Sequence, residues 1–320
     1  MPRVTYQNTA VDIADTESVL DGLENAGFAI PFSCRSGLCQ SCMMQADSPP
    51  PASAQDGLSN NQISQHFFLA CSCYPQTDME VNLIGDTNRT QGIVVDKYLL
   101  NEQVMCLQIE ADCRWFPGQY INLWHDDIQG RSYSIASRCD DKKIMELHIK
   151  RHEQGLVSRW VHDQLQPGQA VTLSKPMGNC FYSDEHEDKP LLMAATGTGL
   201  APLYGILLEA LARKHNAPIK LYAAAGEPSG LYYVDELKKL AATHTNIEYI
   251  PCVRRNAGDS GYIEEDVVPL VKERHQSLKG WKIFLCGSID MIKQLQRHSF
   301  FQGAAVTDIL VDAFTSARPS

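Results

Sequence analysis

Three cysteines stand close together near the start of the sequence, and a fourth follows after a long gap. Cys34, Cys39 and Cys42 have the spacing C-x4-C-x2-C, and Cys71 comes later in the chain. Four thiolates in this order are typical ligands of a 2Fe-2S cluster, in which each iron takes two protein sulfurs. A structural zinc site usually combines two C-x2-C pairs, whereas only Cys39 and Cys42 form one here. The spacing therefore predicts an iron–sulfur cluster.

The fourth ligand has two candidates, because Cys73 stands only two positions after Cys71. Cys71 closes the apolar run of residues 68–70, and we therefore prefer it and interpret Cys73 as a spare thiol. Small residues such as Gly37 let the loop backbone, with its N–H donors, come close to the cluster sulfurs.

The length and composition of the chain are those of a multidomain globular protein. A chain of 320 residues, with 44% hydrophobic and 21% charged residues, fits two or three domains. No stretch approaches the roughly 20 apolar residues of a membrane span, and the N-terminus lacks a basic-then-apolar signal pattern. Seven of the eleven cysteines lie outside the cluster set at scattered positions, which favours free thiols in a reducing compartment. We expect a cytoplasmic protein without a membrane span.

The charge is acidic and uneven. A net charge of −10 argues against nucleic acid as a partner, since binding to phosphates needs a basic surface. Residues 1–85 hold two basic and nine acidic side chains. This acidity either steers the cluster module to a basic partner or is a solvated face that aids solubility.

Residues 1–85 read as a first domain around the cysteine loop. Alternating residues on either side of a polar turn predict a hairpin over 4–13. Ser18 begins a helix that Gly27 ends. Residues 79–84 alternate as a closing strand, and the domain is expected to end near Gly85.

The pattern of predicted secondary structure changes once in the rest of the chain. Residues 90–186 contain short β-type runs, which predict an antiparallel β-barrel with one helix after Gly155. Residues 188–320 alternate strand and helix, which predicts a doubly wound parallel sheet. The fold class is thus multidomain, β and α/β.

The predicted barrel carries the groups that a flavin dinucleotide requires. A guanidinium suits the pyrophosphate, a phenol the isoalloxazine ring, a hydroxyl the flavin N5, and a helix N-terminus a phosphate. Two segments supply these groups, namely Arg131-Ser132-Tyr133-Ser134 and the helix start with Gly155, Val157 and Ser158. Either segment alone is a weak signal, but their joint occurrence predicts an FAD site.

The third domain has a loop suited to a second dinucleotide. Between an apolar strand and a helix lies Thr196-Gly197-Thr198-Gly199, where backbone N–H groups can hold a pyrophosphate. Because Pro202 replaces the last glycine of G-x-G-x-x-G, the general dinucleotide fingerprint is not met. Cys286 and Gly287 follow another apolar strand, and Cys286 on composition alone is also compatible with an ordinary buried thiol.

With these motifs the chain resembles the ferredoxin–NADP reductase superfamily. Together with the cysteine loop it resembles the reductase components of multicomponent bacterial oxygenases, such as those of benzoate dioxygenase and methane monooxygenase. The resemblance covers essentially the whole chain and implies a β-grasp ferredoxin domain, an FAD barrel and an NAD domain. It also supports Cys71, because such ferredoxins have Tyr-Pro three residues after the last ligand, as Tyr74-Pro75 here.

The resemblance also implies roles for the residues singled out above. In the FAD barrel, Arg131 and Ser132 belong to the flavin strand, Arg131 binding the phosphates, while Tyr133 stacks on the flavin, Ser134 bonds near N5, and Gly155, Val157 and Ser158 hold the pyrophosphate. In the NAD domain, residues 197–202 match the superfamily's G-T-G-x-A-P, and Cys286-Gly287 lies beside the nicotinamide. The prolines usual after this turn are replaced by Ser288-Ile289.

Two further features complete the expected site. Asp312-Ala313-Phe314 resembles the superfamily's acid-x-aromatic close to the flavin, and we assign Phe314 to the catalytic set with Ser134 and Cys286; the alternative is a frayed terminal aromatic. Glu227 stands where users of NADPH tend to carry an arginine. A carboxylate there accepts from ribose hydroxyls and repels a phosphate, which predicts NADH as the cofactor.

These roles together predict an oxidoreductase. We expect NADH to reduce FAD and the 2Fe-2S cluster to pass single electrons to a separate acceptor protein, such as an oxygenase. Two alternatives stay open: the reductase of a deoxysugar-forming dehydratase, which shares all three modules, and a non-catalytic redox sensor.

Overall fold

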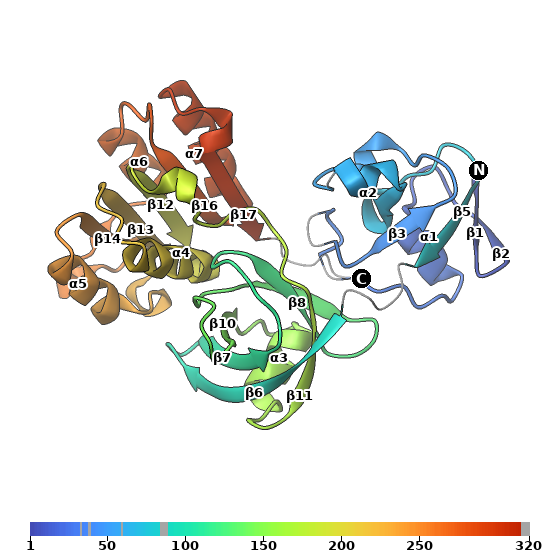
Figure 1. Cartoon of the computed structure of the whole chain (residues 1–320), viewed down its shortest axis with the longest axis horizontal. Helices are drawn as coiled ribbons and strands as arrows, with labels where there is room; N and C mark the ends of the chain where they lie inside the picture. Colours follow the sequence, from blue (N-terminus) through green and yellow to red (C-terminus); the bar gives the residue numbers. More distant parts are fainter. Residues whose placement is uncertain (33, 38–39, 59, 84–88, 315–320) are drawn as a thin grey trace.

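The computed structural model describes residues 1–32, 34–37, 40–58, 60–83 and 89–314. Three sheets divide these residues into three units in chain order, blue, green, and yellow to red in Figure 1. Among the described residues, none of the helices combines the length and the hydropathy that a bilayer crossing requires. The predicted end of the first domain, Gly85, lies outside the described residues.

The first unit is a five-stranded mixed sheet packed against a helix, as the β-grasp prediction requires. Its strand order is β2-β1-β5-β3-β4, and β1 pairs with β5 in parallel. The bounds are β1 (Arg3–Tyr6), β2 (Thr9–Asp12), α1 (Val19–Asn25), β3 (Met43–Ala46), α2 (Asn60–Ser64), β4 (Phe67–Leu69) and β5 (Met79–Leu83). The predicted hairpin and helix are confirmed, and Ser18 Oγ caps α1 by accepting from Asp21 N at 3.1 Å. Leu20 and Leu23 of α1 are fully buried in the core of this unit.

The second unit is an antiparallel barrel, again as predicted. Its strand order is β10-β7-β6-β11-β8-β9, and a bridge between Ile135 and Leu147 links the two ends of the sheet. The bounds are β6 (Arg89–Leu99), β7 (Val104–Ala111), β8 (Tyr120–Trp124), β9 (Gly130–Ser134), β10 (Ile144–Lys150), α3 (Leu156–Asp163) and β11 (Ala170–Ser174). Residues 131–134 form most of strand β9.

The third unit is a parallel sheet with helices on both faces. Its order is β15-β14-β13-β12-β16-β17, so the chain reverses direction of travel at β12. The bounds are β12 (Leu191–Thr196), α4 (Leu200–Ala212), β13 (Ile219–Ala225), α5 (Val234–Thr243), β14 (Ile247–Val253), β15 (Ile263–Glu264), α6 (Val267–Arg274), β16 (Lys282–Ser288), α7 (Ile289–Phe301) and β17 (Ile309–Phe314). Leu191 and Met193 pack into the core on one face of the sheet, and Leu192 and Ala194 into the other. Burial on both faces explains why β12 is apolar throughout rather than alternating.

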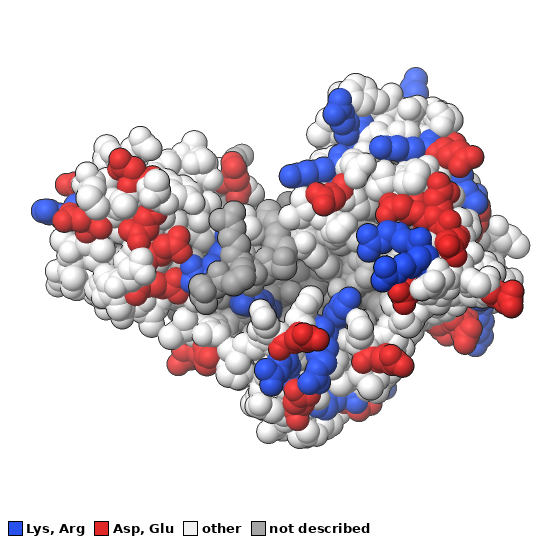
Figure 2. Space-filling view, turned by 180° about the vertical axis from the view of Figure 1, so that it is seen from behind, with Lys and Arg blue, Asp and Glu red and all other residues white. Residues whose placement is uncertain are grey.

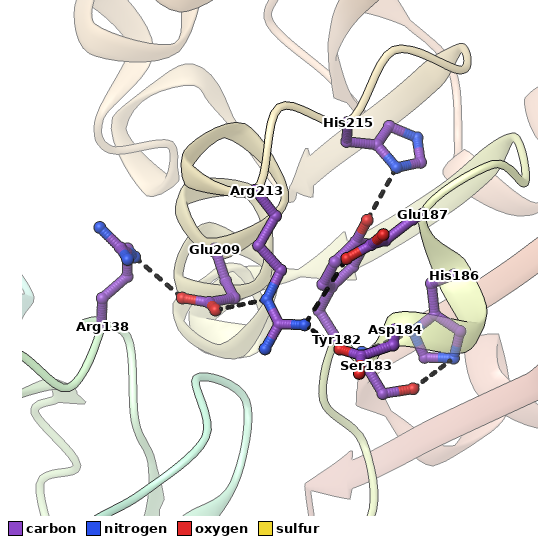
Figure 3. A network of polar contacts seen from close by, with 9 residues as sticks. All are labelled: Arg138, Tyr182, Ser183, Asp184, His186, Glu187, Glu209, Arg213 and His215. Carbon is purple, nitrogen blue, oxygen red and sulfur yellow. Dashed lines mark hydrogen bonds and ion pairs between the residues drawn. The ribbon is translucent and has the colours of Figure 1, made fainter.

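An ionic network joins the second and third units (Figure 3). Glu209 of α4 accepts from Arg138, which follows the barrel strand β9, and from Arg213, each at 2.8 Å. Arg213 also pairs with Asp184 and Glu187 in the segment that connects the two units. Burial alone raises the pKa of Glu209, but the two guanidinium groups outweigh it and hold that pKa below its usual range.

A short backbone bridge joins the first unit to the second. Phe32 N donates to Ile128 O at 3.2 Å, and Gly130 N donates to Phe32 O at 3.5 Å. Phe32 and Gln129 thereby form a parallel bridge. Phe32 lies two residues before Cys34, and Gly130 begins β9, so the bridge connects the cysteine loop to the predicted flavin strand.

Candidate functional site

The cysteine loop brings three of its four predicted ligands into one cluster. Gly37 N donates to Cys71 Sγ at 3.3 Å, Cys71 N donates to Cys42 Sγ at 3.4 Å, and Ser36 N donates to Cys34 Sγ at 3.4 Å. Backbone N–H groups directed at sulfurs are what an anionic iron–sulfur cluster requires. The described part of the loop therefore fits such a cluster. Cys39 lies outside the described residues.

The two candidates for the fourth ligand differ in their surroundings. Cys71 follows β4 and lies against Cys42 and Gly37. Cys73 is fully buried in the apolar core, where its backbone carbonyl accepts from Val19 N at 2.8 Å. Cys71 accordingly remains our proposed ligand.

An arginine within the loop fixes it to the first unit, which the sequence analysis missed. Arg35 forms ion pairs with Asp21 and Glu24 of α1, and its guanidinium lies 4.1 Å from the centroid of the Phe32 ring. The side chain is only 17% exposed, so these ion pairs are partly shielded from water. The loop is thereby held to α1 on one side and to the barrel bridge on the other.

The predicted flavin strand offers four consecutive side chains at the edge of the barrel. Ser132 Oγ donates to Asn122 Oδ1 at 2.7 Å, and Arg131 Nη1 donates to Gly130 O at 2.7 Å. Tyr133 is half-buried and packs against the barrel core, while Ser134 is buried. Because side chains alternate along a strand, Arg131 and Tyr133 lie on one face of β9, and Ser132 and Ser134 on the other.

Helix α3 supplies backbone donors rather than side chains. Its N-cap is Gly155, so the N–H groups of its first turn have no capping side chain beside them. Ser158 Oγ accepts from His152 N at 3.2 Å and donates to Gly155 O at 3.3 Å, and Val157 is buried in the barrel core. A phosphate held here would therefore bind the backbone N–H groups of Val157 and Ser158, since the N–H of Gly155 already donates to His152 O at 3.0 Å.

The Thr-Gly-Thr-Gly loop and the Cys-Gly turn are in direct contact. Ser288 N donates to Thr196 Oγ1 at 2.8 Å. A Cβ on Gly199 would lie 2.2 Å from Cys286 O, and one on Gly287 would lie 2.3 Å from Thr196 Oγ1. Gly287 also has φ +122°, a conformation that favours glycine. The two halves of the predicted nicotinamide site are thus fitted together through glycines. In place of prolines, Ser288 caps α7 by accepting from Met291 N.

A serine, an aspartate and a cysteine meet where the barrel joins the parallel sheet. Ser134 Oγ donates to Asp312 Oδ2 at 2.6 Å, although the two residues are far apart in sequence. Asp312 stands beside Cys286 in the parallel register of β16 and β17. Burial raises the pKa of Asp312 to about 6, against the opposing effect of the hydrogen bond from Ser134. Strand β17 continues to Phe314, which is half-buried rather than frayed.

Asp312 therefore joins the site that the sequence analysis assigned to Ser134, Cys286 and Phe314. The acid-x-aromatic pattern was the available signal for it. Burial beside Asp312 and Cys180 raises the pKa of the Cys286 thiol well above its usual range, so the group is a neutral thiol at neutral pH. Ser134 and Asp312 are thus linked across the two units, whereas the Cys286 thiol is fully buried and lies 3.8 Å from Cys180 Sγ.

Three family models match the three units in chain order. They are the 2Fe-2S iron-sulfur cluster binding domain over residues 4–76, the oxidoreductase FAD-binding domain over 94–182 and the oxidoreductase NAD-binding domain over 193–297. The chain belongs to the ferredoxin–NADP reductase superfamily. It is an oxidoreductase of this superfamily that uses FAD, NADH and a 2Fe-2S cluster.

Relatives within the superfamily match the chain along its whole length. The reductase component of the naphthalene 1,2-dioxygenase system of Pseudomonas putida is 27% identical over 318 residues, 96% of each chain. The CDP-6-deoxy-L-threo-D-glycero-4-hexulose-3-dehydrase reductase of Yersinia pestis is 26% identical, over 95% of this chain and 94% of that protein. The crystal structure of an Amycolatopsis cytochrome P450 reductase superposes with a TM-score of 0.71 at 25% identity, covering 99% and 100% of the two chains.

Within the superfamily's NAD domain, Glu227 has an ion-pair partner here. Arg255 Nε lies 2.7 Å from Glu227 Oε1, and both side chains are exposed. Arg254 approaches the same turn: its guanidinium would lie 3.7 Å from a Cβ on Gly226. One guanidinium group thus pairs with the carboxylate that we predicted to favour NADH, and a second lies near the preceding glycine.

Proposed function

We propose that this chain is the NADH-dependent reductase of an oxygenase system, which delivers single electrons to a separate oxygenase protein. The relatives named above include a reductase of this kind and match from end to end. We also propose the cytoplasm as its location, where NADH is available and where the described cysteines, which form no disulfide with one another, stay reduced.

The bound groups supply the redox chemistry: NADH donates a hydride, FAD accepts it, and the cluster carries one electron at a time. In our proposal the chain's residues position these groups. The contact of Gly199 with Cys286 sets the nicotinamide beside the flavin strand. Asp312 holds the Ser134 hydroxyl in one orientation toward the flavin edge, and the buried surroundings exclude water from the transfer.

The observation that carries the proposal is the bridge between Phe32 and Gln129. It ties the residue two positions before cluster ligand Cys34 to the strand that holds Arg131, Tyr133 and Ser134. A cluster loop attached at the flavin strand gives a short covalent and hydrogen-bonded route out of the flavin. A redox sensor would need neither this connection nor a complete nicotinamide site.

The test is to block electron transfer from the flavin to the cluster while leaving reduction of the flavin by NADH intact. Cys42→Ser replaces a soft thiolate with a hydroxyl that binds iron poorly, so the cluster is lost while FAD stays bound. We expect reduction of ferricyanide by NADH, which draws electrons directly from the flavin, to survive. Anaerobic reduction of cytochrome c, a basic one-electron acceptor protein, should collapse. Cys73→Ser is the matched control and should retain the cluster and both activities.

Two results would refute the proposal. If Cys42→Ser lacks the cluster but reduces cytochrome c at the wild-type rate, the cluster is not on the electron path. If the wild type turns over NADH with neither acceptor, the sensor alternative is favoured. A deoxysugar dehydratase as the acceptor is the second candidate, because a reductase of that class also matches the whole chain. Supplying purified oxygenase or dehydratase components as acceptors separates the two.

A further inference from the structure

Three side chains able to bind a metal lie together outside the electron path. Cys106 belongs to β7, and Glu146 and His148 belong to β10. The two strands are antiparallel neighbours, and His148 stands directly opposite Cys106. Since cross-strand partners and residues two apart share a face of a sheet, all three side chains project from the same face.

The atoms that would bind a metal are already close to one another. Cys106 Sγ, a carboxylate oxygen of Glu146 and a ring nitrogen of His148 all lie within 4.8 Å of one another. His148 Nε2 lies 2.8 Å from Glu146 Oε1. Two ligand atoms on a tetrahedral zinc ion stand about 3.3–3.7 Å apart. Small side-chain rotations therefore suffice to place an ion between them.

The other polar atoms of these side chains have partners of their own. His148 Nδ1 lies 3.1 Å from the Tyr232 hydroxyl, and Gln108 Nε2 donates to Glu146 Oε2 at 3.4 Å. Burial raises the pKa of the Cys106 thiol to about 12, and a hydrogen bond with the Tyr98 side chain opposes that rise. Outer partners of this kind orient metal ligands, and a histidine whose Nδ1 is held this way directs Nε2 inward.

The third unit closes over the cluster. The Tyr204, Tyr232 and Tyr233 rings have centroids 6.3, 5.2 and 5.3 Å from that of the His148 ring. Cys106 and His148 are buried, and the Glu146 side chain is 13% exposed. In Figure 1, β7 and β10 lie on the side of the barrel that faces α4. The Tyr233 hydroxyl donates to Glu146 Oε1 at 2.9 Å and is a candidate for a fourth ligand.

We propose that Cys106, Glu146 and His148 bind one Zn²⁺ ion at the junction of the FAD and NAD units. Once Cys106 gives up its proton on binding the metal, its thiolate and the Glu146 carboxylate balance the charge of a divalent cation. Sulfur and nitrogen ligands select zinc over calcium or magnesium, which take oxygen ligands. The ion would tie two strands of the barrel to the tyrosines of the NAD unit, separately from electron transfer.

The experiment uses the full chain loaded with FAD and its cluster. The protein is dialysed against a chelator, incubated with Zn²⁺ and freed of excess metal, and its zinc, iron and sulfide are measured. We expect about one zinc ion per chain, with the iron and sulfide of the cluster unchanged. Cys106→Ser and His148→Gln should lose the zinc. Cys252→Ser, which removes a buried thiol of the NAD unit, is the matched control and should keep it.

X-ray absorption at the zinc edge of the wild type gives a readout that needs no variant. One sulfur with nitrogen and oxygen neighbours supports the site, whereas four sulfurs mean that zinc has entered the cysteine loop instead. The proposal is overturned by four-sulfur zinc, by wild-type protein that retains no zinc, or by zinc content that is equal in all four proteins. In those cases the contact between Glu146 and His148 is a shielded hydrogen bond and nothing more. If Cys106→Ser loses FAD, the wild-type spectrum decides alone.

Discussion

Adding one methyl group at Gly199 should disable hydride transfer while leaving the bound cofactors in place. In Gly199→Ala the new Cβ would stand 2.2 Å from Cys286 O and 2.5 Å from the Cys286 carbonyl carbon. An ordinary carbon–oxygen contact is about 3.3–3.6 Å, so the loop and the turn must separate by roughly 1 Å. Both are backbone, so neither can yield by changing a rotamer. A misplacement of about 1 Å can cost about 100-fold in rate.

The assay mixes the protein rapidly with NADH under anaerobic conditions and records the reduction of bound FAD by its absorbance. We expect the limiting rate in Gly199→Ala to fall about 100-fold, with FAD and iron contents equal to those of the wild type. Gly226→Ala is the control, because its Cβ would meet only the Arg254 guanidinium at an ordinary 3.7 Å. A Gly199→Ala protein that is reduced at the wild-type rate would show that this contact does not position the nicotinamide.

Three further outcomes follow from individual charged groups. The Asp312 carboxyl group, whose pKa burial raises to about 6, is neutral below that pH and charged above it, so the rate of flavin reduction should rise through about pH 6 and this step should vanish in Asp312→Asn. Comparable kcat/KM for NADH and NADPH in the wild type would contradict our NADH assignment. Glu227→Ala should free Arg255 and raise kcat/KM for NADPH about tenfold. The double variant, which also carries Arg255→Ala, should lose this gain. Asp308→Asn should destabilise the NAD unit by about 3–5 kcal/mol in chemical denaturation, because it removes the carboxylate 2.8 Å from the ammonium of Lys282, a side chain only 4% exposed, and leaves Lys282 and Lys189 as neighbouring cations. An unchanged midpoint would show that the buried ammonium does not depend on this carboxylate.

Much of the fold was predictable because its signals are local. Alternation gave the hairpin of β1 and β2, and the apolar segments of β12, β13 and β16 gave the parallel sheet. Strands β3 and β4 were not predicted, because three or four residues are too few to show a period. The cysteine spacing is likewise a property of one short segment and its later partner.

The contacts between units could not be predicted from the sequence. Ser134 and Asp312 belong to different units, and their hydrogen bond depends on the parallel register of β17 and on how the barrel packs against the sheet. The bridge from Phe32 to Gln129 uses only backbone atoms, so no residue type in the sequence indicates it. Arg35 was visible inside the cysteine loop, but its two acidic partners lie on α1 and are recognisable only once helix and loop are side by side.

The unequal joints between the three units bear on how such chains evolve. Figure 2 shows the acidic first unit as a lobe of its own, beside the two units that the Glu209 and Arg213 network binds together. A joint made of ion pairs and buried tyrosines requires both partners to change together. Among the residues that the structure describes, the joint of the first unit consists of the two backbone hydrogen bonds of Phe32, and such a joint accepts almost any side chains at its surface. The first unit, which carries the iron–sulfur cluster, is therefore the part that gene recombination can exchange most freely. The FAD and NAD units, which oxidise NADH, can in this way serve many different acceptors.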